Sequence, residues 1–151
     1  GTNSGCGKTT VVCALLKALS ERSVDVGAFK CGPDYIDPMF HSKIIGTKSY
    51  NLDSYFCPAG TLNYLLKKNS ADMNIIEGAM GYYDGLGGTS ATASAWHLAD
   101  TLGLPVLLVD CGLTDEGRRA AALLSDMNTK LLTPQELAAY YTEEDTTEQG
   151  R

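Results

Sequence analysis

The 151-residue sequence lacks any apolar run approaching the roughly 20 residues that a membrane-spanning helix needs, so no membrane segment is predicted. It has no Cys-x-x-Cys pair and only two histidines, which leaves a zinc site without support. Basic residues are outnumbered: 12 Lys and Arg stand against 18 Asp and Glu, for a net charge of −6. Because nucleic-acid backbones are held by clustered Lys and Arg, we expect no nucleic-acid partner.

The cysteines also argue against a disulfide framework. Their number is odd and no signal peptide accompanies them, so reduced thiols and a cytoplasmic location are expected. Cys111 follows an apolar run but lacks the glycine-rich turn of a nucleophile and a plausible histidine partner, since His41 and His97 stand in unrelated settings. We interpret it as structural. The five cysteines are Cys6, Cys13, Cys31, Cys57 and Cys111.

Apolar periodicity predicts helices and strands in alternation. The helices are expected over Thr9–Leu19, Pro58–Lys67, Ala93–Leu102 and Gly117–Leu124, and the strands over Val24–Phe29, Met73–Ile76 and Pro105–Val109. Such alternation implies an α/β fold, a three-layer sandwich around a mainly parallel sheet. The loops that follow the strands should then share one rim. No strand precedes Gly1, so we expect the sheet to be incomplete, without its first and later strands.

Residues 1–10 read GTNSGCGKTT and predict a P-loop. Glycines allow backbone N–H groups to converge on phosphates, Lys8 can reach the β- and γ-phosphates, and the Thr9 hydroxyl can join the shell of a Mg²⁺ ion. The alternative is a glycine-rich turn that only caps a helix. It does not readily explain a Gly-Lys-Thr-Thr run followed by an amphipathic helix. The predicted nucleotide-binding residues are Asn3, Ser4, Gly5, Cys6, Gly7, Lys8, Thr9 and Thr10.

A second cluster, FKCGPDYIDP, follows the first predicted strand and places one lysine and two carboxylates in one loop. Lys30 could neutralise a substrate carboxylate or a phosphoryl group in transfer. Asp34 or Asp37 could hold Mg²⁺, which needs few protein carboxylates. Gly-Pro-Asp and Asp-Pro are also strong turn sequences, so a purely structural turn remains an equal alternative.

The third cluster, IIEGAMGYYDG, ends an apolar strand with Glu77, where a P-loop protein carries its metal-associated acid. The alternative for Glu77 is the cap of a surface loop. Asp84 lies in a Tyr-Asp-Gly sequence, which could act in catalysis or simply form a turn.

These three clusters, with NLDSYF and LADTLGLPVLLVD, resemble the family of cobyrinic acid a,c-diamide synthase and nickel-sirohydrochlorin a,c-diamide synthase over roughly residues 1–112. The resemblance implies an ATP-dependent amidoligase. In that reaction ATP converts a side-chain carboxylate of a tetrapyrrole into an acyl phosphate, and ammonia from glutamine displaces the phosphate. The alternative is a partition-type ATPase, which acts as a nucleotide switch by dimerising. Those proteins carry a second signature lysine at the position that Asn3 occupies in this chain, which weighs against this alternative.

The resemblance also implies roles for individual residues. ATP and Mg²⁺ would be bound by Lys8 and Thr9, with Asp34 and Glu77 in the metal shell. Lys30, Asp37 and Asp84 would be catalytic. Substrate contacts would come from Asp37, Tyr35, Asn51 and Asp53, although Asn51 and Asp53 could equally belong to a polar loop before the next helix.

The predicted organisation is a partial ATP-binding amidoligase domain over residues 1–126 and a C-terminal helix with an acidic tail over residues 127–151. The tail could also be a remote piece of a longer protein. No glutamine-amidotransferase motif occurs in the sequence, so glutamine-dependent turnover by this chain alone is not expected. The sequence leaves two further alternatives: the chain forms a homodimer, or it is a nucleotide-binding fragment without catalytic activity.

Overall fold

Three parallel strands form the main sheet of the computed structural model, which describes residues 1–46, 48–110 and 130–132. They are β1 (Val26–Cys31), β2 (Tyr50–Leu52) and β3 (Met73–Glu77), in the spatial order β2-β1-β3. The register pairs Lys30 of β1 with Glu77 of β3. Since paired residues of neighbouring strands point to the same face, these two side chains start side by side.

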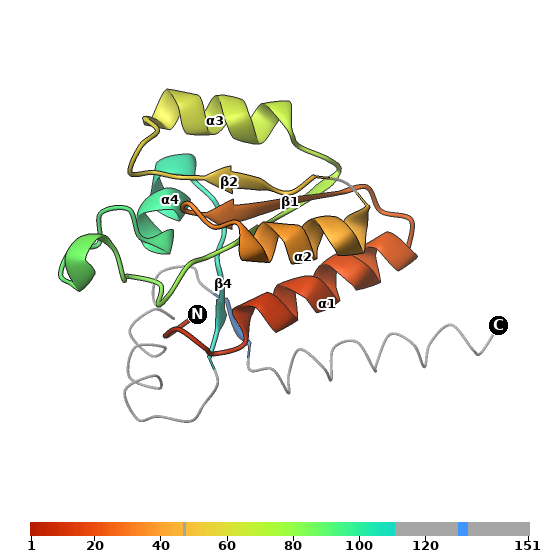
Figure 1. Cartoon of the computed structure of the whole chain (residues 1–151), viewed down its shortest axis with the longest axis horizontal. Helices are drawn as coiled ribbons and strands as arrows, with labels where there is room; N and C mark the ends of the chain where they lie inside the picture. The colour runs from red at the N-terminus through yellow and green to blue at the C-terminus, as the bar shows by residue number, and fades with distance from the viewer. Residues whose placement is uncertain (47, 111–129, 133–151) are drawn as a thin grey trace.

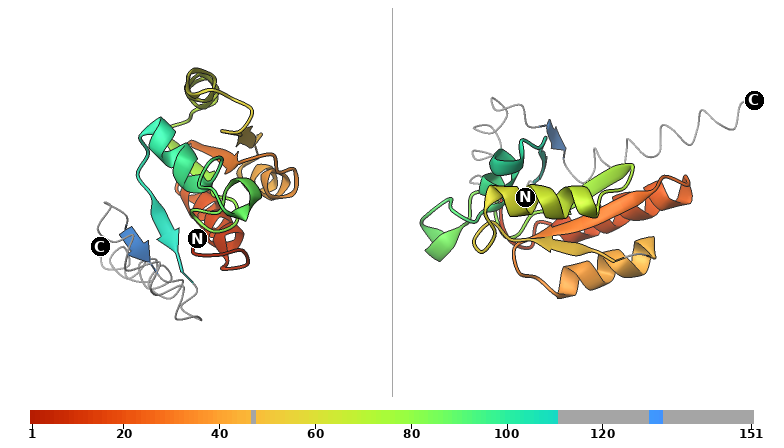
Figure 2. Two further views of the ribbon diagram at one scale, coloured as in Figure 1. Left: turned by 90° about the vertical axis from the view of Figure 1, so that its left-hand side faces the viewer. Right: turned by 90° about the horizontal axis from the view of Figure 1, so that it is seen from above.

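Helices cover both faces of this sheet (Figures 1 and 2). Residues of α1 (Lys8–Glu21) and α2 (Ile36–Ile45) pack on one face, while α3 (Ala59–Lys68) and α4 (Ala95–Leu102) pack on the other. A 3-10 turn, η1 (Leu86–Gly88), precedes α4. This arrangement confirms the predicted α/β fold with a parallel sheet between helical layers. No helix within the described ranges is long and apolar enough to cross a bilayer.

The core divides along β1, every residue of which is buried. Phe29 and Cys31 point to one face, where they join apolar side chains of β2, α3 and α4. Val26 and Ala28 point to the other, against α1. Lys30 follows this second set by alternation. The charged residue of β1 therefore faces the layer that contains the P-loop helix.

A second, two-stranded parallel sheet is formed by β4 (Leu107–Val109) and β5 (Lys130–Leu132). The prediction that the end of β4 reaches the P-loop is confirmed: the Thr2 N–H donates to the Val109 carbonyl at 3.2 Å, and the Thr2 hydroxyl donates to Asp110 at 3.0 Å. Among the described residues, however, β4 pairs only with β5 and does not join the main sheet.

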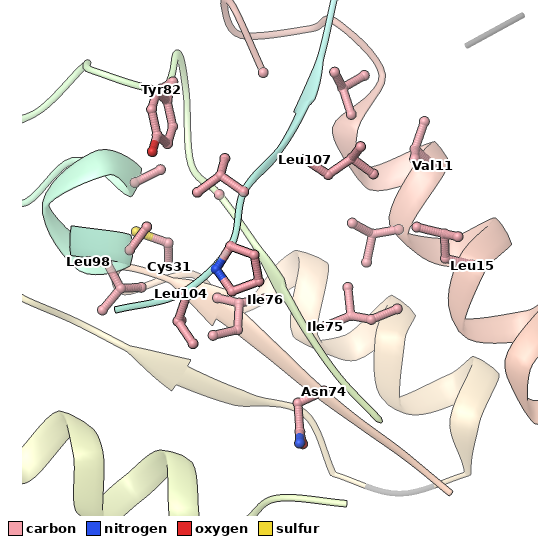
Figure 3. Close-up of a pocket in the computed structure, with 18 residues that line it drawn as sticks. Val11, Leu15, Cys31, Asn74, Ile75, Ile76, Tyr82, Leu98, Leu104 and Leu107 are labelled. Atoms are coloured by element: carbon pink, nitrogen blue, oxygen red, sulfur yellow. The ribbon is translucent and has the colours of Figure 1, made fainter. Parts of the chain in front are cut away.

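An apolar hollow of about 270 Å³ separates β3 from β4 (Figure 3). Ile75 and Ile76 line it from β3, Leu107 from β4, and Val11 and Leu15 from α1. Because side chains and open space lie between the two strands, their backbones do not meet there. The main sheet therefore ends at β3 in the described part of the chain.

The predicted elements that lie in the described ranges are present, with ends within two residues of those expected. Helix α4 begins at Ala95 rather than Ala93 because Ala93 has a φ of +64° and the Ser94 hydroxyl caps the helix by accepting from the His97 N–H. The predicted helix over Gly117–Leu124 lies outside the described residues.

Four elements were not predicted: α2, β2, the turn η1, and β5, a strand within the segment that was expected to form a C-terminal helix and acidic tail. Turn residues dominate the start of α2, but the Asp34 carboxylate accepts from the N–H groups of Ile36 and Asp37 and so satisfies the first turn. Pro38 is tolerated because it also lies in that turn. Strand β2 has only three residues, too few to show a periodic pattern.

We expect truncation of the buried core to be costly. Leu62 of α3 is 1% exposed, and Leu62→Ala should lower the free energy of unfolding by about 2–5 kcal/mol. Urea denaturation would measure the loss. Thr61→Ala, an exposed position on the same helix, is the control and should change stability by less than about 0.5 kcal/mol. Equal effects of the two changes would contradict this account of the core.

Candidate functional site

The P-loop forms one wall of a polar hollow of about 410 Å³. Gly7 caps the amino end of α1 with a φ of +88°, a left-handed conformation that side-chain-bearing residues rarely adopt. The amino terminus of α1, where unpaired N–H groups and the helix dipole favour anions, therefore opens into the hollow. The lining residues are Ser4, Gly5, Gly7, Lys8, Thr9, Thr10, Lys30, Asp34, Asp37, Glu77, Ala79 and Met80.

Two residues of the predicted nucleotide site do not line this hollow. Cys6 is buried and packs with Val11 and Val109. Asn3 contributes its backbone carbonyl, which accepts a 2.8 Å hydrogen bond from the Lys8 ammonium. The Lys8 nitrogen also lies 3.7 Å from the Cys6 sulfur. Both residues thus contact or support the lysine rather than the cavity.

The opposite wall is a cluster of charges around Lys30, which is 3% exposed. Its ammonium donates to Asp37 at 2.5 Å and to Glu77 at 3.2 Å, and lies 3.7 Å from an Asp34 oxygen. Strand pairing supplies the contact with Glu77. The loop between β1 and α2 supplies Asp34, and the first turn of α2 supplies Asp37. All four side chains that the sequence placed near the phosphates on this side therefore meet.

The charge of Lys30 is stabilised by these neighbours. Burial by itself lowers the Lys30 pKa, but the hydrogen bond to Asp37 and the charge of Glu77 outweigh it, so the pKa is raised above its ordinary value. Lys30 is therefore an ammonium ion at neutral pH. Its charge is paired with the carboxylates of Asp37 and Glu77.

Glu77 contacts three other side chains of the site, those of Thr9, Lys30 and His41. One carboxylate oxygen, Oε1, accepts from the Thr9 hydroxyl at 2.6 Å and from Lys30. The other, Oε2, lies 2.7 Å from His41 Nε2. Burial raises the Glu77 pKa, but the hydrogen bonds from His41 and Thr9 and the Lys30 charge reverse this, so the pKa is lowered overall. Glu77 is thus ionised although it is only 1% exposed.

His41 is the site residue that sequence reasoning missed. It lies four residues after Asp37, so both occupy one face of α2. That spacing would have identified it if α2 had been predicted. Its side chain is fully buried and contacts Glu77 and Ser49.

The remaining predicted residues do not line the hollow. The Asp84 carboxylate accepts from the Gly81 N–H at 2.8 Å, and that of Asp53 accepts from the Tyr55 N–H at 2.8 Å. These are turn contacts, as the structural alternatives expect. Asn51 donates to the Asp34 carbonyl at 2.8 Å, and Tyr35 is 80% exposed. The catalytic role of Asp84 and the substrate roles of the other three stay predictions.

The donors around the hollow suit a magnesium ion that arrives with a phosphate ligand. Within residues 1–46, 48–110 and 130–132, no group of three or more His, Cys, Asp or Glu side chains is arranged to hold a metal by itself. Mg²⁺, however, prefers oxygen ligands, keeps several waters and takes only one or two protein carboxylates when phosphates supply the rest. Thr9, Asp34 and Glu77 provide that chemistry.

A glycine-rich turn at the amino end of a helix, facing a buried acid at the end of a parallel strand, defines a P-loop nucleotide-binding domain. Comparison with known proteins agrees. A model of the CobQ/CobB/MinD/ParA nucleotide binding domain matches residues 1–137, and the chain belongs to this family.

Among curated proteins the chain is similar to several cobyrinate a,c-diamide synthases. The one from Fusobacterium nucleatum is 41% identical over 134 residues, which are 89% of this chain and 29% of that protein. The one from Salmonella typhimurium is 44% identical over 126 residues, 82% and 28% of the two chains. The one from Clostridium tetani is 46% identical over 107 residues, 71% and 24%. The chain thus spans less than a third of these relatives, and the resemblance seen in the sequence is confirmed.

The lowered Glu77 pKa predicts a pH dependence of stability. Ionised Glu77 stabilises the fold above its ordinary pKa of 4.5, and this contribution is lost as the pH falls toward the lowered value. Glu77→Gln should therefore show a flatter decline in the free energy of unfolding between neutral pH and about pH 3. Chemical denaturation at a series of pH values measures this. Glu21→Gln, which alters an exposed pair with Lys17, should keep the unaltered slope.

Proposed function

We propose that the chain binds ATP with Mg²⁺ in the polar hollow between the P-loop and the Lys30 cluster. Three observations support the proposal. The amino end of α1 opens into the hollow, Lys8 lines it, and the Thr9 hydroxyl is held there by Glu77. Bound Mg²⁺ would neutralise phosphate charge, with Thr9, Asp34 and Glu77 as its nearest oxygen donors. The match to a nucleotide-binding family supports the same ligand class.

We further propose that this ATP serves to amidate the a and c side-chain carboxylates of a tetrapyrrole. A carboxylate oxygen of the substrate attacks the γ-phosphorus and ADP leaves, which gives an acyl phosphate. Ammonia, free or derived from glutamine, then attacks the acyl carbon, loses a proton and expels phosphate. The names of the similar proteins suggest cobyrinate as the substrate.

The observation that carries this proposal is the buried Lys30 ammonium on the same hollow as the P-loop. Two polyanions, a triphosphate and a carboxylate, must approach each other before the first step, and fixed positive charge lowers the cost of that approach. Lys8 supplies positive charge from the P-loop wall, and on the opposite wall Lys30 offsets part of the negative charge of Asp34, Asp37 and Glu77. In the proposed second step Asp37, which is paired with Lys30, accepts a hydrogen bond or a proton from ammonia. The proposed role of Asp84 is catalytic, and Tyr35, Asn51 and Asp53 are proposed to contact the substrate.

Nucleotide binding should depend on Lys8. Lys8→Ala removes a charge-assisted hydrogen bond to phosphate, which should weaken ATP affinity about 10- to 100-fold. Isothermal titration calorimetry measures this directly. Lys17→Ala changes an exposed lysine on the same helix and should bind ATP as tightly as the unaltered chain. Equal affinities of the two variants would place the nucleotide elsewhere.

The reaction can be tested by mass spectrometry of the tetrapyrrole. The chain is incubated with ATP, Mg²⁺, ammonia and cobyrinic acid, and the expected products show one and then two exchanges of a carboxyl hydroxyl for an amino group. Ammonia replaces glutamine because the sequence contains no glutamine-amidotransferase motif. Glu77→Gln should sharply reduce conversion, since it removes the negative charge that pairs with Lys30 and replaces one of the two acceptor oxygens by an NH₂ donor.

The opposite results are equally informative. Full conversion by Glu77→Gln would remove Glu77 from the site. No conversion of any tetrapyrrole, together with ATP-dependent dimerisation in sedimentation experiments, would overturn the amidoligase proposal in favour of a nucleotide switch.

A further inference from the structure

His41 is a fully buried polar side chain that has no role in the proposed reaction steps. It projects from α2, one helical turn beyond Asp37, and both of its ring nitrogens have partners. Nε2 lies 2.7 Å from Glu77 Oε2, and Nδ1 lies 3.2 Å from the Ser49 hydroxyl. The ring therefore connects Glu77, in the wall of the hollow that contains Lys30, with the segment that leads into β2.

The direction of the shorter hydrogen bond, between His41 and Glu77, follows from the chemistry of the two groups. An ionised carboxylate only accepts hydrogen bonds, so Nε2 carries the hydrogen and donates it to Glu77. The other end of the ring is fixed by the backbone. The Ser49 hydroxyl lies 3.2 Å from Nδ1 and 3.1 Å from the Ala28 carbonyl of β1, and its one hydrogen can be donated to only one of them. The Ser49 N–H donates to the Ser42 hydroxyl of α2 at 2.8 Å. The orientation of His41 is thus set by two rigid elements.

This bond determines how Glu77 uses its two oxygens. Because Oε2 is bound by His41, Oε1 is the atom that accepts hydrogen bonds from the Thr9 hydroxyl and the Lys30 ammonium. The Thr9 hydroxyl donates its only hydrogen to Oε1, so the lone pairs of the Thr9 oxygen can act as acceptors or metal ligands in the hollow. A carboxylate free to rotate could pair both oxygens with Lys30 and release Thr9.

We propose that His41 is a positioning residue, which fixes the Glu77 carboxylate so that Glu77 in turn orients the Thr9 hydroxyl toward the metal–nucleotide site. The inference rests on the proposed binding of ATP with Mg²⁺. It assigns His41 no contact with substrate. Because α2 also carries Asp37, the same bond ties that acid to the strand that carries Glu77.

Two variants of matched chemistry test this role. The amide nitrogen of His41→Gln can occupy the place of Nε2 and keep the bond to Glu77. His41→Asn is shorter by one methylene, so its amide keeps the Ser49 side of the ring and stops short of Glu77. Partners of metal-site ligands commonly contribute 10- to 100-fold to metal affinity. We therefore expect the enhancement of ATP affinity by Mg²⁺ to fall by about 10- to 100-fold in His41→Asn and to be largely retained in His41→Gln.

The readout is the ratio of ATP affinities with Mg²⁺ and with a chelator, measured by calorimetry. Affinity without Mg²⁺ should be the same in the unaltered chain and both variants. Leu62→Ala serves as the control for stability, because it weakens the core without touching Glu77 and should keep the full Mg²⁺ effect. A purely structural histidine would move the unfolding temperature of both variants and leave the ratio unchanged.

The outcomes are separable. An unchanged ratio in His41→Asn, or an equal loss in both variants, would overturn the positioning role. If His41→Asn does not fold, Ser49→Ala takes its place: it keeps the ring but frees its orientation, and an unchanged ratio there also refutes the proposal. An unaltered chain whose ATP binding ignores Mg²⁺ would refute the proposed function itself, and the role of His41 with it.

Discussion

The buried carboxylate of Glu77 is the constraint on which the site depends. A buried charge without partners is very costly, and Glu77 is satisfied by side chains from three separate elements. Lys30 comes from β1, Thr9 from α1 and His41 from α2. These contacts can form together only when the strand register and the packing of both helices are correct. The carboxylate thus links the placement of the P-loop to the pairing of the sheet.

The two faces of the main sheet are accordingly stabilised in different ways. Beneath α3 and α4 the core is apolar, built around Phe29, Leu52 and Leu62. On the face of α1 and α2, apolar packing at the amino ends of the strands gives way to the charged cluster at their carboxyl ends. The site is therefore part of the interior of the domain on one side. Its side chains are held by burial as well as by hydrogen bonds, which is the condition for a preorganised electrostatic site.

Membership of the nucleotide-binding family and similarity to cobyrinate a,c-diamide synthases place this arrangement in a chemical context. The P-loop by itself indicates only that a phosphate-containing ligand is held. The proposed activation of a carboxylate rests on the acids and the lysine across the hollow, because they line the same hollow as the P-loop. The polar contacts of Asp53 and Asp84 lie within turns, so the described structure itself gives them no catalytic geometry.

The sequence by itself determined the features that depend on neighbouring residues: the P-loop before α1, the alternation of strands and helices, and the acid at the end of β3. Local backbone chemistry and periodicity encode these. Only the tertiary structure decided that Asp34 caps α2, that β4 pairs outside the main sheet, and that His41 reaches Glu77 across 36 positions of sequence. Those contacts join segments whose patterns are individually ordinary. They follow from burial and strand register, which no single stretch of sequence contains.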